Sequence, residues 1–486
     1  MTFDDKLNRY ESELGLLPES WEVVVLENYL ESLIDYRGKT PKKAVSGITT
    51  LSAKSVKMGN IKYSSAYYIS KETYDKFMVR SFPKKGDVLL TTEAPLGCVA
   101  LLDRDDVCVA QRLLTLRGEK RELDNRYLQY YLMSHIGQHQ LLSRATGSTV
   151  QGIKRTEFSK VLLIRPPFKE QINIAKTLGE LDEKIELNTQ TNQTLEQIAQ
   201  AIFKSWFVDF EPVKAKISVL EAGGTAEQAE LTAMSVISAK DEVALKQLQA
   251  EQPKAYAELA QTAALFPSAM GESELGDIPY DWSTPKINEI AKIIKGKSYK
   301  SIELEESNTA LVTLKSFNRG GGYRLDGLKE YTGKFKPEQE VFAGDLIIAY
   351  TDVTQAADVI GKPAMVISDS RYDHLVISLD VAVIRPKNDD LKYYLYGIAK
   401  TNRFQQHTNA HSTGTTVLHL SKNAVPDYKF TKPNEDLIKI YRKHTQPIFM
   451  SINENIEQNT SLAASRDALL PKLLSGELTI PSTEEA

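Results

Sequence analysis

Three short patterns in the sequence could support catalysis, phosphate binding or metal binding. Arg165-Pro166-Pro167-Phe168 resembles the acidic or Asn-Pro-Pro-aromatic box with which amino-methyltransferases hold a target amine. Arg165 stands where the residue that accepts a hydrogen bond from that amine should be, and no glycine-rich cofactor loop accompanies the box. Gly296-Lys297-Ser298 ends like a phosphate-binding loop, but Ala291 stands where the first glycine of such a loop must be. The sequence therefore predicts neither kind of site.

The third pattern is a set of histidines, and it does not predict a metal site. The histidines lack cysteine or carboxylate partners at ligand spacing, so we expect packing or helix-surface roles for them. They include His135, His139, His407 and His411. The two cysteines, Cys98 and Cys108, form no ligand pair and suit a reducing compartment. Because the sequence has neither a secretion signal nor an apolar run of about 18 residues, we expect a cytoplasmic protein with no membrane contact.

The net charge of −4 does not indicate nucleic-acid binding, and any basic surface must be local. A single basic cluster is more often a solvated face. Arg37-Gly38-Lys39 and Lys295-Gly296-Lys297 favour a shared role, because they begin 16 and 13 residues after Trp21 and Trp282. The basic residues in these local clusters include Arg37, Lys39, Lys43, Lys57, Arg144, Lys154, Lys295, Lys297, Lys300 and Arg319.

Two turns rich in hydroxyl groups could add contacts to phosphate. Residues 146–150 read Thr-Gly-Ser-Thr-Val, and residues 413–417 read Thr-Gly-Thr-Thr-Val. Hydroxyls and the backbone amides that glycine frees suit phosphate binding. The alternative is a tight turn that packs its domain onto a helix, and both interpretations stay open. The candidate residues are Thr146, Ser148, Thr149, Thr413, Thr415 and Thr416.

These candidates belong to an internal duplication of the chain. Gly414 lies 267 residues after Gly147, and the same offset pairs Asn192 with Asn459. Residues 146–195 align with residues 413–462 at this one offset without a gap. Isolated coincidences would not do so, and the repeat therefore indicates two copies of one unit.

Each copy ends in a long helical pattern whose seam repeats every 3.5 residues on average, which is the condition for a coiled coil. Asn188 and Asn192 lie on the seam of the first helix, and Asn455 and Asn459 lie on that of the second. Buried amides there lower stability but favour the register in which they pair. The alternative is a polar gap that faces solvent.

The two helices should form a rod with one irregular point. Gly179 and Pro447 fall one position apart in the aligned repeat, so a break or kink is expected there. From residue 180 to residue 206, the rod would measure about 40 Å at 1.5 Å per residue.

The regions outside the rod should be small sheets with one helix each. Residues 1–14 should form a helix or a loose arm, and two helices, 225–238 and 240–264, should connect the halves. The predicted strands are 88–91, 98–102, 113–116, 346–349, 364–367 and 381–384, and the predicted domain helices are 126–142 and 391–404.

Four motifs give the chain a resemblance to a known family. Leu17-Pro18-Glu19-Ser20-Trp21 is echoed at residues 278–282, and residues 166–174 read Pro-Pro-Phe-Lys-Glu-Gln-Ile-Asn-Ile. Residues 202–212 and 467–478 close the two helices with Ile-Phe-Lys-Ser-Trp-Phe-Val-Asp-Phe-Glu-Pro and Asp-Ala-Leu-Leu-Pro-Lys-Leu-Leu-Ser-Gly-Glu-Leu. The layout resembles the specificity subunit of a type I restriction–modification system over nearly the whole chain.

The resemblance implies an α+β fold with two duplicated target recognition domains. Two long antiparallel coiled-coil helices would separate these domains in a pseudo-twofold layout. The expected divisions are 1–167 and 275–432 for the recognition domains, 168–212 and 433–480 for the conserved helical regions, 213–274 for a helical connector and 481–486 for a disordered tail.

The resemblance also implies a non-catalytic subunit that reads two unlike half-sites of double-stranded DNA. The basic residues and the turn hydroxyls named above would then be its predicted DNA contacts. Its partners would be two modification subunits, which bind S-adenosylmethionine and methylate adenine at N6, and motor–nuclease restriction subunits. This chain would bind no cofactor of its own. Trp206, Phe207 and Phe210 would dock the modification subunits. The alternatives are a fused DNA methyltransferase with its own catalytic site, which lacks its motifs here, and a purely structural coiled-coil protein.

Overall fold

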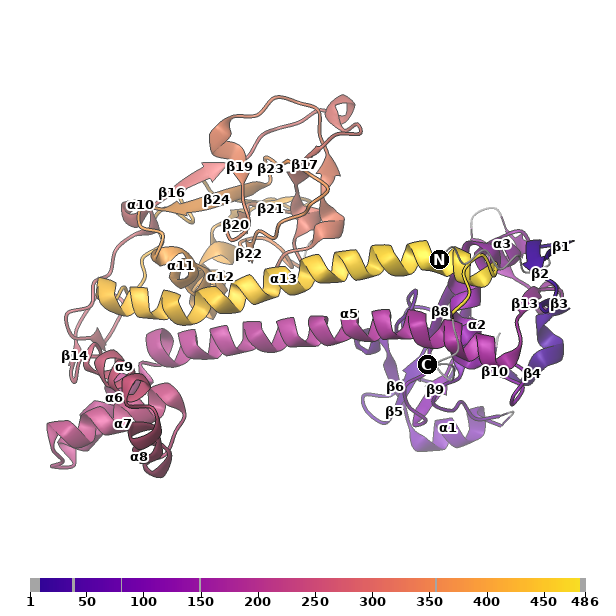
Figure 1. The fold of residues 1–486 in the computed structure, drawn as a ribbon. Helices are drawn as coiled ribbons and strands as arrows, with labels where there is room; N and C mark the ends of the chain where they lie inside the picture. The colour runs from indigo at the N-terminus through magenta and orange to yellow at the C-terminus, as the bar shows by residue number, and fades with distance from the viewer. Residues whose placement is uncertain (1–8, 37–39, 80, 148–149, 355, 481–486) are drawn as a thin grey trace, which may run out of the picture. The chain divides into compact units, whose positions relative to one another are not determined.

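The computed structural model describes residues 9–36, 40–79, 81–147, 150–354 and 356–480 (Figure 1). The chain divides into two compact units: unit 1 takes residues 1–186 and 459–486, and unit 2 takes residues 187–458. Two long helices, α5 (Phe168–Phe203) and α13 (Glu435–Leu474), contribute residues to both units.

A four-stranded antiparallel sheet with the strand order β4-β10-β7-β8 lies at the centre of unit 1. Alternate residues of a strand face opposite sides of the sheet. Val88 and Leu90 accordingly enter one hydrophobic core, which includes residues of the neighbouring helices, while Leu89 enters a second core. Apolar residues on both faces explain why β7 is buried along its whole length. The sheet and its helices are β4 (Leu30–Asp35), β7 (Val88–Thr92), β8 (Leu96–Leu101), β10 (Leu113–Gly118), α2 (Asn125–Met133) and α3 (His135–Leu142).

Smaller elements complete unit 1. A second sheet has the order β6-β5-β9, and three two-stranded pairs join β1 to β2, β3 to β13 and β11 to β12. These elements are β1 (Arg9–Ser12), β2 (Gly15–Pro18), β3 (Glu22–Val25), β5 (Ile48–Leu51), β6 (Tyr67–Ile69), α1 (Lys71–Phe77), β9 (Val107–Val109), β11 (Ala145–Thr146), β12 (Gly152–Ile153), α4 (Arg155–Phe158) and β13 (Leu162–Arg165).

Unit 2 repeats this architecture with a four-stranded sheet in the order β16-β24-β20-β22. A second sheet has the order β18-β17-β23-β19, and a third has the order β21-β26-β25. The elements are α10 (Ile287–Ile290), β16 (Ala291–Lys295), β17 (Thr309–Val312), β18 (Lys329–Glu330), β19 (Glu340–Val341), β20 (Leu346–Ala349), β21 (Thr351–Asp352), β22 (Pro363–Met365), β23 (His374–Ile377), β24 (Val381–Pro386), α11 (Leu391–Lys400), α12 (Asn402–Ala410), β25 (Ser412–Thr413) and β26 (Leu418–Leu420).

Unit 2 also contains a group of four helices between α5 and its sheets. Lys216 is buried there, and its ammonium donates hydrogen bonds to the carbonyls of Ala263 at 2.7 Å and Phe266 at 2.8 Å. These bonds, with an ion pair to Glu230 at 2.6 Å, satisfy all three donors of the ammonium. The group and the short pair after it are α6 (Glu211–Glu221), α7 (Ala226–Ser238), α8 (Glu242–Glu251), α9 (Pro253–Ala264), β14 (Met270–Gly271) and β15 (Ile278–Pro279).

Helices α5 and α13 pair in an antiparallel direction within each unit. In unit 1 the Arg466 guanidinium lies 2.7 Å from the Asp182 carboxylate. In unit 2 the Asn455 amide donates to Asn192 Oδ1 at 2.8 Å, and Asn188 donates to Gln458 Oε1 at 2.7 Å. The seam asparagines therefore bond across the two helices, Asn192 to Asn455 directly and Asn188 to Gln458.

Equivalent side chains make equivalent contacts in the two units. The Tyr127 hydroxyl donates to the carbonyl of Ile164, and the Tyr394 hydroxyl, 267 residues later, donates to the carbonyl of Thr431. Gln138 and Gln405 each donate two bonds to backbone carbonyls at matching positions. The duplicated α+β fold predicted from the sequence is confirmed.

Several local predictions were wrong. Residues 9–18 form the hairpin β1–β2 rather than a helix. The helices predicted at 126–142 and 391–404 are each two helices, because the hydroxyls of Ser134 and Thr401 cap a new helix in the middle of the predicted span. The connector has four helices rather than two.

Of the break or kink predicted in the rod, the break is absent. Both long helices continue without interruption, α5 through Gly179 and α13 through Pro447.

Candidate nucleic-acid interface

The candidate site in unit 1 is one edge of its four-stranded sheet, where β4 and β7 end and β8 and β10 begin. The register places Asp35 opposite Leu114 and Thr91 opposite Leu113 at this edge. The hairpin β11–β12 joins the same edge, because Glu93 forms a backbone bridge with Gly152. We call these residues the sheet edge of unit 1.

Unit 2 has the same edge in the same register. Lys295 lies opposite Ala382, and Ala349 lies opposite Val381. The hairpin β25–β26 again joins the edge, here through the pairing of Thr351 with His419. The sheet edge of unit 2 is thus built from the ends of β16, β20, β24 and the β21–β26 pair.

Individual backbone bonds show that the two edges share one frame. The Thr92 amide donates to the Arg112 carbonyl at 2.9 Å, and the Tyr350 amide donates to the Asp380 carbonyl at 2.7 Å. Thr92 and Tyr350 each follow the last residue pair at the sheet edge. Arg112 and Asp380 each precede the central strand of their sheet, so the two bonds are equivalent.

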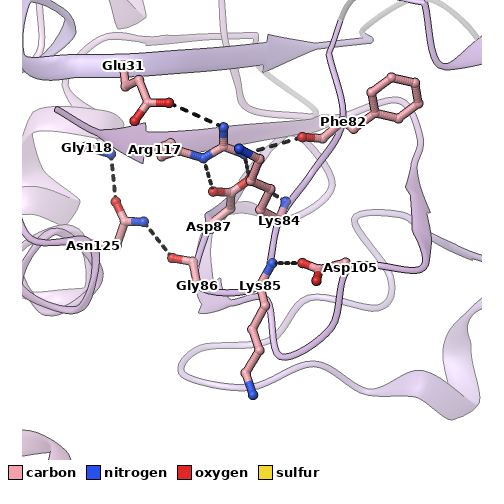
Figure 2. A network of polar contacts seen from close by, with 10 residues as sticks. All are labelled: Glu31, Phe82, Lys84, Lys85, Gly86, Asp87, Asp105, Arg117, Gly118 and Asn125. Carbon is pink, nitrogen blue, oxygen red and sulfur yellow. Dashed lines mark hydrogen bonds and ion pairs between the residues drawn. The ribbon is translucent and has the colours of Figure 1, made fainter. Parts of the chain in front are cut away.

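Side-chain bonds at the start of β7 and the end of β10 hold these two strands together (Figure 2). Arg117 binds Asp87 through two bonds, Nε to Oδ1 at 2.7 Å and Nη2 to Oδ2 at 2.8 Å. The same carboxylate accepts the backbone amide of Lys84 at 2.8 Å. In unit 2, Arg385 lies 3.1 Å from Asp345 in the corresponding place. These ion pairs fix the strands whose other ends form the candidate edges.

Some of the predicted contacts of unit 1 meet at its sheet edge. Thr146 and Lys154 are exposed and line a pocket of about 420 Å³. Arg144 precedes β11 directly, and its guanidinium donates to the Gln140 carbonyl at 3.1 Å. Four predicted residues lie outside the described residues: Arg37, Lys39, Ser148 and Thr149.

Two other predicted residues of unit 1 lie away from this edge. Lys43 is exposed beside β6, and its ammonium lies 5.0 Å from the centre of the Tyr67 ring. Lys57 lies in a turn that contacts the middle of β8, where the Gly59 amide donates to the Val99 carbonyl. The structure therefore does not group these lysines with Thr146 and its neighbours.

In unit 2 the sheet edge carries Lys295, whose ammonium lies 4.6 Å from the centre of the Tyr350 ring. Lys297 follows it, is half-buried, and bridges to the backbone of Ser378. Lys300 is exposed in the next loop.

Arg319 and the threonine turn are both connected to strand β21 of unit 2, through the loop that follows it and through its pairing with β26. The Arg319 side chain is 80% exposed, and its guanidinium lies 3.7 Å from Asp358. Asp358 belongs to the loop after β21, the strand that pairs with the threonine hairpin. The exposed turn residues are Thr413, Thr415 and Thr416.

The buried Asp352 organises that loop. Its carboxylate accepts the amides of Thr354 at 2.7 Å and Val359 at 2.6 Å. Burial opposes ionisation, but these hydrogen bonds outweigh it and lower the pKa of Asp352. Sequence reasoning missed this residue because its role depends on amides that are not adjacent to it in the chain.

Glycine is required in both hydroxyl-rich turns. Gly147 and Gly414 have φ angles of 108° and 121°. A Cβ atom would lie 2.3 Å from the Val150 carbonyl oxygen in the first turn and 2.0 Å from the Val417 carbonyl oxygen in the second. The turns therefore share one strained geometry that only glycine adopts without cost.

The strand register aligns Lys295 with Asp35, because each lies opposite the second residue of its central strand. Arg37 and Lys39 lie outside the described residues, so the shared role of the Arg-Gly-Lys and Lys-Gly-Lys patterns stays a prediction.

The segment predicted to dock other subunits contributes mainly to the core of unit 2. Trp206 and Phe207 are each 3% exposed, and Phe210 is half-buried. The Trp206 ring packs edge-on against Phe266, and Phe207 packs edge-on against Tyr394. Periodicity alone could not distinguish this core role from a docking role.

Over the described ranges, no helix is long and apolar enough to cross a membrane. Within the same part of the chain, no group of three histidine, cysteine or carboxylate side chains could hold a metal ion.

Comparison with known proteins identifies the family. Residues 18–197 match the family model described as the type I restriction modification DNA specificity domain. The chain is 29% identical to the HindI specificity subunit of Haemophilus influenzae over 81% of this chain and 87% of that protein. It is 24% identical to the MjaIX specificity subunit of Methanocaldococcus jannaschii over 97% and 96% of the two chains. The chain belongs to the type I restriction–modification specificity subunits.

The fold of this specificity subunit agrees with that assignment. A crystal structure of the S subunit from M. genitalium superimposes with a TM-score of 0.52 over 99% of both chains, at 16% identity. A specificity subunit is the non-catalytic component of its restriction–modification enzyme and determines its DNA specificity. The resemblance noted in the sequence is confirmed.

Proposed function

We propose that this specificity subunit reads a two-part DNA site, with one unlike half-site for each recognition domain. The observation that carries the proposal is the shared backbone frame of the two sheet edges, which present different loops and side chains. Because the two domains share one strand pairing, each could contact its half-site in the same orientation. Because they expose different side chains, the two half-sites would differ in base sequence. The proposed recognition domains are residues 1–167 and 275–432.

Phosphate contacts would fix the register of each domain on the duplex, while base edges would supply the sequence information. Thr413, Thr415 and Arg319 suit the first task because they are exposed near one edge and can donate hydrogen bonds. Thr146 and Lys154 suit it in unit 1. Because the net charge is −4, we propose that binding depends on these local groups rather than on the overall charge.

The helical regions, residues 168–212 and 433–480, would set the gap between the half-sites. Helices of 36 and 40 residues extend about 54 and 60 Å. Either length exceeds one duplex turn, about 34–36 Å. Because the helices have a fixed length, we propose that the two half-sites are separated by a fixed number of base pairs whose sequence is not recognised. Residues 213–274 would connect the halves, and residues 481–486 would form a tail.

The chain is part of a type I restriction–modification complex. We propose that it binds double-stranded DNA together with two modification subunits, which carry S-adenosylmethionine and methylate adenine at N6. Motor–nuclease subunits would join this assembly for restriction.

Docking of a modification subunit is proposed at the exposed residues around the buried Trp206 and Phe207. Val208 is 42% exposed and lines a pocket of about 290 Å³ together with Phe203 and Phe449. An exposed apolar surface beside a pocket suits a protein contact.

A matched pair of variants tests this docking surface. Val208→Asp should weaken co-purification of the modification subunit, because it places a charge in an apolar contact. Val243→Asp lies on α8, where Val243 is 75% exposed, and should have no effect. Equal retention of the modification subunit by both variants would refute the docking proposal.

Mapping of methylated adenine in the host genome, with and without this gene, tests the proposed function. Loss of one motif with two short blocks around a fixed gap is expected on deletion, and its return is expected on complementation. Loss of a single continuous motif would contradict the two-domain reading.

A further inference from the structure

The two residues that precede the central strand of each sheet occupy the same place in the two units. Gln111 and Arg112 precede β10, and Leu379 and Asp380 precede β24. The strand register makes them equivalent, because Leu113 faces Thr91 in the same way that Val381 faces Ala349. The strand pairing is therefore common to the two units, although Arg112 has a left-handed backbone conformation and Asp380 does not.

Arg112 and Leu379 are exposed to solvent, whereas Gln111 and Asp380 are half-buried. The Arg112 side chain is 46% exposed, and its guanidinium lies 3.5 Å from Glu93, a loose ion pair. Leu379 is 53% exposed. Asp380 is partly exposed and accepts a hydrogen bond from the Thr351 hydroxyl at 2.8 Å.

A space for a ligand lies beside these residues in unit 1. Gln111, Arg112 and Glu93 line the pocket of about 420 Å³ that also includes Thr146 and Lys154. Arg112 has a φ angle of 67°, a left-handed conformation that is uncommon for arginine. Such a conformation in an exposed residue at a pocket is typical of functional positions.

The chemistry of the two pairs differs in a way that base recognition would use. Arginine donates two hydrogen bonds to the O6 and N7 atoms of guanine, and glutamine pairs with the N6 and N7 atoms of adenine. Aspartate accepts from the N4 amine of cytosine, and apolar side chains contact the thymine methyl group.

We infer that Gln111 and Arg112 in unit 1, and Leu379 and Asp380 in unit 2, are base-reading positions that make the two half-sites unlike. The inference rests on the proposed reading of DNA by the two sheet edges. Arg112 reads guanine and Gln111 reads adenine in the first half-site. Asp380 reads cytosine and Leu379 contacts a thymine methyl in the second.

The test uses the full chain in complex with its modification subunits. Bound duplexes are selected from a pool randomised over both half-sites and sequenced. Arg112→Ala should lower the preference for guanine at one position of the first half-site by about ten- to a hundredfold. The second half-site should be selected as before. Asp380→Ala should affect one position of the second half-site alone.

Arg121→Ala is the matched control. Arg121 is also exposed and also left-handed, with a φ angle of 65°, but it follows β10 instead of preceding it. Its replacement should leave both half-sites unchanged. Should Arg112→Ala fail to fold, Arg112→Lys keeps the charge but not the two-bond geometry, and it should lose the same preference.

The outcomes distinguish base recognition by Arg112 from phosphate contact by Arg112. Uniformly weaker binding with every preference retained would assign Arg112 to phosphate contact and overturn the inference. Unchanged selection by Arg112→Ala and Asp380→Ala would overturn it as well. Failure of the wild-type complex to select any two-part site would instead refute the proposed function on which the inference rests.

Discussion

Removal of Arg117 should destabilise the sheet of unit 1 more than removal of Arg385 destabilises that of unit 2. Both arginines bind the aspartate at the start of the neighbouring strand. Arg117 and Asp87 have exposed side-chain fractions of 14% and 2%, whereas Arg385 and Asp345 have 32% and 10%. Arg117→Met would leave the Asp87 carboxylate buried, with the backbone amide of Lys84 still donating a hydrogen bond to it.

The magnitudes follow from this difference in burial. Breaking a buried ion pair by removing one partner costs about 3–5 kcal/mol. Removal of Arg385 also leaves a buried carboxylate, but one closer to solvent, so the cost should be smaller, about 1–3 kcal/mol. Since about 1.4 kcal/mol corresponds to a factor of ten, Arg117→Met should raise local opening more than a hundredfold, and Arg385→Met by about ten- to a hundredfold.

Peptide-resolved hydrogen exchange measures this opening in each sheet separately, which a single melting curve of a two-unit protein does not. Peptides covering β7 and β10 should exchange much faster in Arg117→Met, while β20 and β24 should remain as in the wild type. Equal acceleration by the two substitutions, each in its own sheet, would refute the argument from burial. Hydrogen exchange of β7 and β10 at the wild-type rate in Arg117→Met would refute it as well.

Three further predictions concern the helix pair, a turn and a buried thiol. Asn192→Leu should lower the free energy of unfolding by about 1–3 kcal/mol because it leaves the Asn455 amide without its partner, whereas the double change to leucine should be near neutral. A double-mutant cycle in urea measures this coupling, and additive losses would contradict it. Gly414→Ala should destabilise unit 2, because the new Cβ atom would lie 2.0 Å from the Val417 carbonyl oxygen; thermal unfolding at or above the wild-type temperature would contradict this. Burial raises the pKa of the Cys108 thiol to about 12. The folded state then holds its proton while the unfolded chain releases it near pH 9, so this contribution to stability is complete below pH 9 and falls as the pH rises toward 12. Denaturant unfolding of wild type and Cys108→Ala at pH 8 and pH 10 should differ in pH slope; identical slopes would contradict it.

The duplication and the main elements could be predicted from the sequence, because the long helices keep one offset without gaps. The central strands were also predictable, since runs such as residues 346–349 are apolar and bounded by turn residues. The break at Ser134 was not predicted, because apolar periodicity continues across it while a hydroxyl cap starts a new helix.

The candidate site was less predictable because it depends on strand pairing. Clusters of basic residues directed attention to Lys43 and Lys57, which lie away from the sheet edge. Arg112 belongs to none of the basic clusters in the sequence. It becomes a candidate DNA contact only when strand pairing places it beside Glu93 and Gly152. The burial of Trp206 likewise depends on contacts with residues far along the chain.

The most direct measurement is binding of the complex to duplexes that carry its mapped methylation motif with one part altered at a time. Scrambling either half-site should abolish specific binding, and a change in the identity of the spacer bases should have no effect. A change in spacer length by one base pair should also weaken binding. Full binding to a duplex with a single intact half-site would contradict the reading of DNA by two recognition domains.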